Sequence, residues 1–369
     1  MQKNKVIIIT LLLVSAGAFL YFFNKKQDRS ENKSAPETTI VNSAGAEIVA
    51  QNLDIPWEIA FLPGGEMLVT ERSGKLLKIG AQTKTVKKIE GVKHIGEGGL
   101  LGLSLHPDFV KNNYIYLYST TQDSSGISNR VERYKFENDT LTDRKVILEG
   151  IKGSVNHDGG RIAFGPDGYL YVTTGDAGSP DLAQDKNSLN GKILRITEEG
   201  DIPSDNPFGN EVYSLGHRNP QGLAWDEKGV LWETEHGPSG LETGNDEINI
   251  IYKGGNYGWP TIKGDETREG LISPVIQSGT EETWAPSGMA YYKGSLFFSG
   301  LRGESLFQVK IKNDNSLVLT SHFKKEYGRI RAVVLGPDGY IYFSTSNNDG
   351  RGRAKSGDDK IFKVDPRPL

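Results

Sequence analysis

Short apolar runs alternate with polar residues along most of the chain, and one phrase of this pattern occurs six times. The phrase consists of an apolar run, a turn rich in Pro, Asp and Gly, and a second apolar run. Such turns between alternating runs favour β-hairpins, because the turn requires residues that tolerate positive φ. The six copies begin at Ala60, Leu103, Ile162, Leu223, Met289 and Val333.

A third strand-like run follows each hairpin, and all of these runs have a period of two rather than 3.6. Each unit is therefore a small antiparallel sheet that cannot bury its faces alone, whereas radial repetition packs neighbouring units together. This pattern predicts an all-β fold, a six-bladed β-propeller with four-stranded blades. A β-sandwich is the alternative, but it would not repeat the same turn phrase. We expect residues 47–53 to pair into the last blade and close the ring.

The N-terminus differs from the rest of the chain. Residues 1–23 contain an uncharged apolar run from Val6 to Phe23 that follows Lys3 and Lys5, which predicts a hydrophobic helix acting as a signal peptide or membrane anchor. Residues 24–46 are polar and predict a flexible linker. The propeller domain is then expected over 47–369, exported to the periplasm or anchored facing it.

Composition narrows the possible chemistry. The chain has 369 residues, 36% hydrophobic and 24% charged, with a net charge of −4 and scattered basic residues, so nothing indicates a nucleic-acid partner. It contains no cysteine, which excludes disulfides, thiolate metal sites and a cysteine nucleophile. Activity must therefore come from other side chains and from bound groups.

The hairpin topology predicts where the polar side chains gather. Residues just before the first strand of each copy and just after its second strand lie at the same end of the hairpin, and so at one mouth of the central channel. The opposite mouth receives mainly Pro-Asp-Gly turns. The residues collected at the polar mouth are Glu97, His157, Arg218, Asn219, Gln221, Arg302, Arg329 and Arg331.

These residue types favour a planar anionic ligand. Guanidinium groups pair with carboxylates and stay charged at any working pH, and His157 is the best candidate for a proton acceptor near neutral pH. The alternative, that these side chains only satisfy nearby loop carbonyls, remains open. Separately, Asp246, Glu247 and Asn249 with Tyr257 offer oxygen ligands for a hard cation such as calcium. The other histidines, at 94, 106, 217, 236 and 322, lack metal-ligand spacing, and most are expected to have ordinary hydrogen-bonded roles.

From about Ala50 to the C-terminus the sequence resembles the quinoprotein sugar dehydrogenase family, that is, soluble pyrroloquinoline-quinone (PQQ) glucose dehydrogenases and the aldose sugar (glucose/sorbosone) dehydrogenases. The resemblance is carried by several phrases in one order. They are Gly-Leu-Leu-Gly at 99–102, His-Pro-Asp-Phe at 106–109, Gly-Gly-Arg-Ile at 159–162, Leu-Asn-Gly-Lys-Ile-Leu-Arg-Ile at 189–196, Gly-His-Arg-Asn-Pro-Gln-Gly at 216–222, Glu-His-Gly-Pro at 235–238, Asp-Glu-Ile-Asn at 246–249 and Asn-Tyr-Gly-Trp-Pro at 256–260.

The resemblance implies a six-bladed propeller that oxidises aldoses to lactones. His157 would accept the proton of the anomeric hydroxyl while hydride passes to C5 of the quinone, and Arg218 would stabilise the oxygen at that carbon. Asn219 and Gln221 would hold the ring of the quinone. Its carboxylates would face Arg302, Arg329 and Arg331, with Arg302 standing where a lysine can occur. An external acceptor would then take the electrons.

The resemblance also implies calcium. The carbonyls of Gly237 and Pro238 would bind the ion that polarises the quinone, and Glu247 and Tyr257 match a second, structural calcium position.

Two positions depart from the family pattern. Glu97 stands where glutamine can contact the cofactor, and a carboxylate beside an anionic quinone is unfavourable unless a cation offsets it. Asn156 replaces an aspartate next to the histidine, which predicts a less firmly oriented ring. Two other functions remain open: a calcium-dependent propeller lactonase or hydrolase, and a non-catalytic propeller that binds sugars or proteins.

Overall fold

The computed structural model describes residues 39–41, 45–238 and 243–369. All of these described residues belong to one compact unit, which spans residues 35–369. The hydrophobic helix expected within residues 1–23 lies outside the described residues. No helix in the described ranges is long and apolar enough to cross a membrane.

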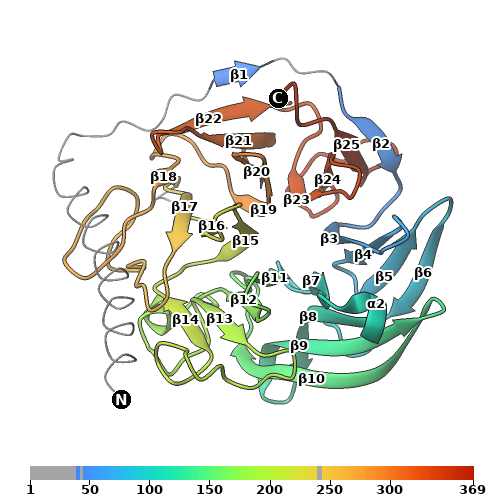
Figure 1. The fold of residues 1–369 in the computed structure, drawn as a ribbon, viewed down its shortest axis with the longest axis horizontal. Helices are drawn as coiled ribbons and strands as arrows, with labels where there is room; N and C mark the ends of the chain where they lie inside the picture. The colour runs from blue at the N-terminus through green and yellow to red at the C-terminus, as the bar shows by residue number, and fades with distance from the viewer. Residues whose placement is uncertain (1–38, 42–44, 239–242) are drawn as a thin grey trace, which may run out of the picture. The chain divides into compact units, whose positions relative to one another are not determined.

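Six antiparallel sheets, the blades, follow one another along the chain and surround a common centre (Figure 1). Blades 1 to 3 consist of β3 Pro56–Phe61, β4 Met67–Glu71, β5 Lys75–Ile79 and β6 Thr83–Lys88; β7 Leu100–Leu105, β8 Tyr114–Asp123, β9 Gly126–Glu137 and β10 Thr140–Lys152; β11 Ile162–Phe164, β12 Leu170–Thr174, β13 Lys192–Ile196 and β14 Val212–Leu215.

The last three blades have the same build, each with its first strand innermost. Blades 4 to 6 consist of β15 Pro220–Trp225, β16 Leu231–Glu235, β17 Glu247–Ile251 and β18 Ile276–Gln277; β19 Pro286–Tyr292, β20 Ser295–Gly300, β21 Ser305–Ile311 and β22 Leu317–His322; β23 Ile330–Leu335, β24 Ile341–Thr345, β25 Ile361–Val364 and β2 Glu47–Ala50. The helical elements of the described chain are α2 Phe109–Asn112 and the 3₁₀ turn η1 Pro180–Ala183. The six-bladed fold predicted from the hairpin repeat is confirmed.

The ring closes as expected from the sequence. Strand β2 pairs antiparallel with β25, so a strand from before the first blade completes the last one. A further strand, β1 Thr39–Val41, lies within the segment predicted to be a linker and pairs in parallel with β22. Pairing with β25 gives β2 hydrogen-bond partners along one edge, as a closed propeller requires.

Alternation along each strand produces the packing between blades. Apolar side chains of neighbouring blades form shared clusters, such as Trp57 and Tyr116 packed with Ile162 and Leu194. The innermost strands of all six blades line a central cavity of about 290 Å³. The fold therefore holds the ends of the inner strands as a rigid ring, and the polar mouth is built on those ends.

Candidate active site

The loops at one end of the inner strands bring most of the predicted polar residues together. The main-chain N–H of Gly159, before β11, donates to Asn219 Oδ1, before β15 (3.0 Å). Arg331, on β23, approaches Gln221, on β15 two blades away around the ring, with Nη1 3.5 Å from Oε1. Since these contacts join blades 3, 4 and 6, the single polar mouth inferred from hairpin topology exists.

His157 lies at this mouth with its imidazole held by a carboxylate. Its Nδ1 is 2.7 Å from Asp176 Oδ1, and Asp176 is buried. Burial by itself raises the pKa of Asp176, but the hydrogen bonds from His157, Gly178 and Trp259 outweigh it, so this pKa lies below its usual value. An ionised carboxylate only accepts, so Nδ1 carries the proton and Nε2 is the nitrogen that can accept one.

The backbone around His157 is as constrained as its ring. His157 has a φ of 61°, and its carbonyl accepts a hydrogen bond from Ala177 (3.2 Å). Gly175 passes so close to this carbonyl that a Cβ there would lie 1.9 Å from the oxygen. Only glycine permits that approach. Asp176 thus supplies the orientation that the Asn156 departure had put in doubt.

Arg218 is buried next to the histidine and carboxylate pair. Its carbonyl accepts the main-chain N–H of Asp176 (2.9 Å), and its guanidinium lies 5.4 Å from the centre of the Trp259 ring. Trp259 also donates through Nε1 to Asp176 Oδ2 (2.8 Å). Trp259 therefore contacts both Arg218 and Asp176, a role that the sequence reading had not given it.

Arg329 and Arg331 form the cationic side of the mouth, around Asp349. Arg329 Nη2 lies 2.8 Å from Asp349 Oδ2, and Arg331 Nη2 lies 3.8 Å from the same oxygen. Burial, together with the nearby Arg72 and Arg329, lowers the pKa of Arg331 to about 9, against the opposing effect of Asp349 and Glu97. The two buried guanidinium groups therefore carry more positive charge than the single carboxylate of Asp349 neutralises. An anionic ligand bound here would compensate the remaining charge.

Arg302 and the predicted calcium ligands Gly237 and Pro238 stand at the same edge but differ in exposure. Arg302 follows β20 and is exposed, whereas Gly237 and Pro238 follow β16 and are buried. The N–H of Gly237 donates to Asp246 Oδ1 (2.9 Å). The roles of all three residues toward a ligand stay predictions.

Glu97 already has partners for both of its carboxylate oxygens. Oε2 accepts the main-chain N–H of His157 (3.0 Å), and Oε1 accepts from Arg351 Nη1 (2.7 Å). Burial raises the pKa of Glu97, but His236, which is protonated in acid, Arg351 and the His157 amide outweigh it and hold the pKa at about 2. Glu97 is therefore ionised, and the cation that offsets it is Arg351.

Two buried polar atoms at the mouth have no hydrogen-bond partner among the described residues, Asn219 Nδ2 and His236 Nε2. Burial lowers the pKa of His236 to about 3, so its ring is neutral near pH 7. A buried polar atom without a protein partner can make its hydrogen bond to a ligand or to water. Together with the arginines, these two atoms fit a polar, anionic group such as a quinone carboxylic acid.

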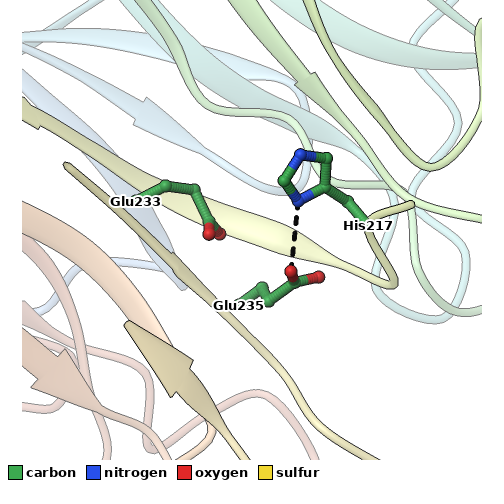
Figure 2. Close-up of side chains that lie close together, drawn as sticks. All are labelled: His217, Glu233 and Glu235. Carbon is green, nitrogen blue, oxygen red and sulfur yellow. Dashed lines mark hydrogen bonds and ion pairs between the residues drawn. The ribbon is translucent and has the colours of Figure 1, made fainter. Parts of the chain in front are cut away.

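Behind Arg218 lies a second group of residues, defined here as the carboxylate cluster: Glu233, Glu235, Glu247 and Asn249. Glu233 and Glu235 alternate on β16, and their cross-strand partners on β17 are Asn249 and Glu247 respectively. Figure 2 shows Glu233 and Glu235 beside His217, with ligand atoms of all three within 4.8 Å of one another. All of these residues are buried.

The carboxylate cluster has more acceptors than donors. Asn249 Nδ2, with two hydrogens, lies 3.1, 3.3 and 3.2 Å from oxygens of Glu233, Glu235 and Glu247, and Glu233 Oε1 has no partner among the described residues. Burial and the charge of Glu235 raise the pKa values of Glu233 and Glu247 well above their usual range. Both ring nitrogens of His217 already have hydrogen-bond partners, Glu235 and Ser214. The atoms that remain available to coordinate a cation are therefore oxygens.

Glu247 thus lies where the sequence predicted a cation ligand, among further carboxylates. The phenol oxygen of Tyr257 donates to the carbonyl of Ile250 (2.6 Å) and accepts the N–H of Tyr252 (2.8 Å). Its ring stacks on His217, with centroids 4.7 Å apart. A contribution of Tyr257 to calcium would therefore come from its main-chain carbonyl.

Several residues of the site were not predicted from the sequence. Some of them nevertheless stand at the hairpin positions from which the predicted residues were chosen. Arg72 directly follows β4 and His236 directly follows β16, the same position after a second strand that gave Arg302. Glu233 and Glu235 share a face through period-two spacing. The additional residues are Arg72, Asp176, Glu233, Glu235, His236, Trp259, Asp349 and Arg351.

Comparison with known proteins agrees with this geometry. The family model described as glucose / sorbosone dehydrogenase matches residues 53–354. The chain is 34% identical to the aldose sugar dehydrogenase YliI of Escherichia coli over 373 residues, covering 90% of this chain and 95% of that protein. It is 36% identical to quinoprotein glucose dehydrogenase B of Acinetobacter calcoaceticus over 255 residues, 59% of this chain and 52% of that one.

A solved structure gives the same relationship. The PQQ-bound form of aldose sugar dehydrogenase from Streptomyces coelicolor superposes with a TM-score of 0.80 at 40% identity, covering 88% of this chain and 99% of that chain. Fold, site and sequence relationships point the same way, and the chain belongs to the glucose/sorbosone dehydrogenase family.

Proposed function

We propose that the protein is a PQQ-dependent aldose sugar dehydrogenase that oxidises the anomeric carbon of aldoses to lactones. The observation that carries the proposal is the His157–Asp176 pair beside buried, undercompensated arginines and two unpartnered polar atoms. A proton acceptor next to an anion site is what removal of a hydroxyl proton and a hydride requires. When bound, PQQ would supply the two-electron acceptor for that hydride.

His157 would act as the general base. Its Nε2 would accept the proton of the anomeric hydroxyl, while Asp176 keeps the other proton on Nδ1 and stabilises the imidazolium that forms. The positive φ and the hydrogen bonds from Ala177 and to Glu97 fix the backbone of His157, which keeps the ring in one position. Pre-organisation of this kind avoids reorientation during the reaction.

The arginines would bind and orient the anionic ligand. Arg329 and Arg331, which both lie close to Asp349, would face the carboxylates of the ligand. Asn219 Nδ2 and His236 Nε2 would hydrogen-bond its polar edges. Arg218, held over Trp259, would stabilise negative charge on the reacting oxygen. We keep Glu97, Gln221 and Arg302 as residues around the bound ring.

We propose calcium as the second cofactor. The carbonyls of Gly237 and Pro238 would hold the ion that polarises the quinone. The carboxylate cluster suits a second, structural calcium, because carboxylate and carbonyl oxygens are the ligands this ion prefers and its charge would offset the buried acids. An arginine-rich mouth favours this function over a lactonase, which would need several carboxylates around an axial calcium.

The cellular setting remains a proposal as well. The hydrophobic run within residues 1–23 supports export to the periplasm, where an external acceptor would receive the electrons. Fractionation of cells that express the full chain, followed by mass determination, tests both the compartment and cleavage of the N-terminal segment.

The decisive experiment is reconstitution. Purified protein incubated with PQQ and calcium should reduce an artificial electron acceptor when aldoses are added, and His157→Ala should abolish turnover while leaving PQQ binding intact. Absence of turnover by the wild type across a panel of hexoses, pentoses and disaccharides would remove the enzymatic assignment. Lactone hydrolysis by the same preparation without PQQ would favour the hydrolase instead.

A further inference from the structure

Arg351 makes a long-range contact at the polar mouth that the proposed reaction does not use. It lies on the loop between β24 and β25, in the closing blade. Its guanidinium reaches Glu97, 254 residues earlier in the chain, and its Nη2 lies 3.3 Å from Asn156 Oδ1. Arg351 thus joins the closing blade to the loops that precede blades 2 and 3.

The two residues contacted are the same two that depart from the family pattern. The resemblance to the quinoprotein sugar dehydrogenases marks Glu97 and Asn156 as departures. Arg351 contacts both of them, the carboxylate of Glu97 on one loop and the amide oxygen of Asn156 on the other.

The contact continues from Arg351 to the proposed base. Glu97 uses one oxygen for Arg351 and the other for the N–H of His157, so its orientation is fixed at both ends. Its own N–H donates to the carbonyl of Val155 (2.9 Å), and Gly96 allows this approach because a Cβ there would lie 2.0 Å from that carbonyl oxygen. Both carboxylate oxygens of Glu97 therefore have hydrogen-bond partners.

The exposure of the two side chains differs. The Glu97 side chain is 16% exposed and that of Arg351 is 57% exposed. An exposed ion pair contributes little by itself, but loss of the arginine would leave a mostly buried carboxylate uncompensated, which is costly. An anionic ligand bound at the same mouth would feel that charge directly.

We propose that Arg351 is a positioning residue that neutralises Glu97, so that a carboxylate can hold the His157 backbone beside an anionic cofactor. This inference rests on the proposed function, because it takes PQQ as that cofactor. Arg351 acts through Glu97 and need not touch the quinone.

The test is a double-mutant cycle on PQQ affinity, measured by titrating apo-protein and following absorbance. Arg351→Gln should weaken PQQ binding by roughly ten-fold or more, since a mostly buried carboxylate loses the cation that compensates it. Glu97→Gln should bind PQQ at least as tightly as the wild type, and the double variant should match Glu97→Gln. Arg351→Lys, which keeps the charge, should stay close to the wild type. Arg353→Gln is the matched control, because Arg353 is an exposed arginine on the same loop.

Two outcomes would overturn the inference. One is PQQ affinity of Arg351→Gln equal to that of the wild type and of Arg353→Gln. The other is a double variant that binds as weakly as Arg351→Gln, which would indicate a merely structural role for the loop. If wild-type protein binds no PQQ, the proposed function fails. The same double-mutant cycle, measured by urea unfolding of apo-protein, then tests whether Glu97 and Arg351 interact. Coupling between Glu97 and Arg351 then supports the pair, and additive effects reject it.

Discussion

Replacing Asp176 with asparagine tests the proposed base without disturbing the cofactor arginines. Asp176 accepts from His157 Nδ1 and Gly178 N–H on one oxygen and from Trp259 Nε1 on the other. An asparagine has one acceptor oxygen, so its NH₂ must face one of these donors. The arrangement that loses least turns the NH₂ toward Trp259 and keeps the bond to His157, but without the negative charge.

The size of the effect follows from that loss. A hydrogen bond to a charged partner contributes about 1.5–3 kcal/mol, which corresponds to a decrease in kcat/KM of roughly 10- to 150-fold. Asp176 is fully buried, so solvent screening reduces this little. The decrease should fall on kcat more than on KM, because the charge stabilises the imidazolium that forms only as the proton is transferred.

The assay is dye reduction at saturating PQQ and calcium, with PQQ affinity measured on the same preparations. Asp181→Asn is the control, since Asp181 is an exposed aspartate on η1, five residues along the chain. An Asp176→Asn enzyme that binds PQQ normally and retains wild-type kcat would refute the assignment of Asp176 as the partner of the base. A loss in PQQ affinity alone would move its role to the cofactor.

Three further outcomes are expected. Trp259→Phe removes the Nε1 donor to Asp176 but keeps an aromatic ring near Arg218. The kcat should therefore fall roughly ten-fold, while the melting temperature stays nearly unchanged. A wild-type kcat in this variant would show that the indole N–H does not contribute to catalysis. The pKa of Glu97 is lowered to about 2, so the ionised carboxylate stabilises the fold above about pH 4.5, and this contribution is lost as the pH falls toward 2. Over this range the unfolding free energy of wild-type apo-protein should fall by about 3 kcal/mol more than that of Glu97→Gln. Parallel curves for the two proteins in acid titrations would contradict the pairing. Calcium should raise the melting temperature of the wild type, measured by differential scanning calorimetry. The rise should be smaller for Glu233→Gln, because this variant loses a buried carboxylate from the carboxylate cluster. An equal rise in both proteins would place the ion elsewhere.

The repeated hairpin made the fold predictable, because turn chemistry and period-two alternation are local properties of the sequence. Each predicted hairpin became the inner strands of a blade, and the closing pairing of β2 with β25 was also foreseen. The same topology located His157, Arg218, Asn219, Gln221, Arg329 and Arg331 at one mouth.

Contacts between distant side chains were less predictable. Sequence spacing alone does not reveal that Asp176 orients His157 or that Arg351 pairs with Glu97 across 254 residues. These pairs depend on loop conformations fixed by tertiary contacts, such as the approach of Gly175 to the His157 carbonyl. The carboxylate cluster could have been found, because Glu233 and Glu235 alternate on one strand and Glu247 and Asn249 alternate on the next.

The pairing of β2 with β25 has a consequence for biosynthesis. Arg329, Arg331, Asp349 and Arg351 all belong to the blade that this pairing completes. During synthesis, β25 is available only after nearly the whole chain has emerged, so the cationic side of the mouth is completed last. On the proposed function, the quinone would therefore bind after ring closure, and a chain truncated before β25 would lack the pairing that closes the ring.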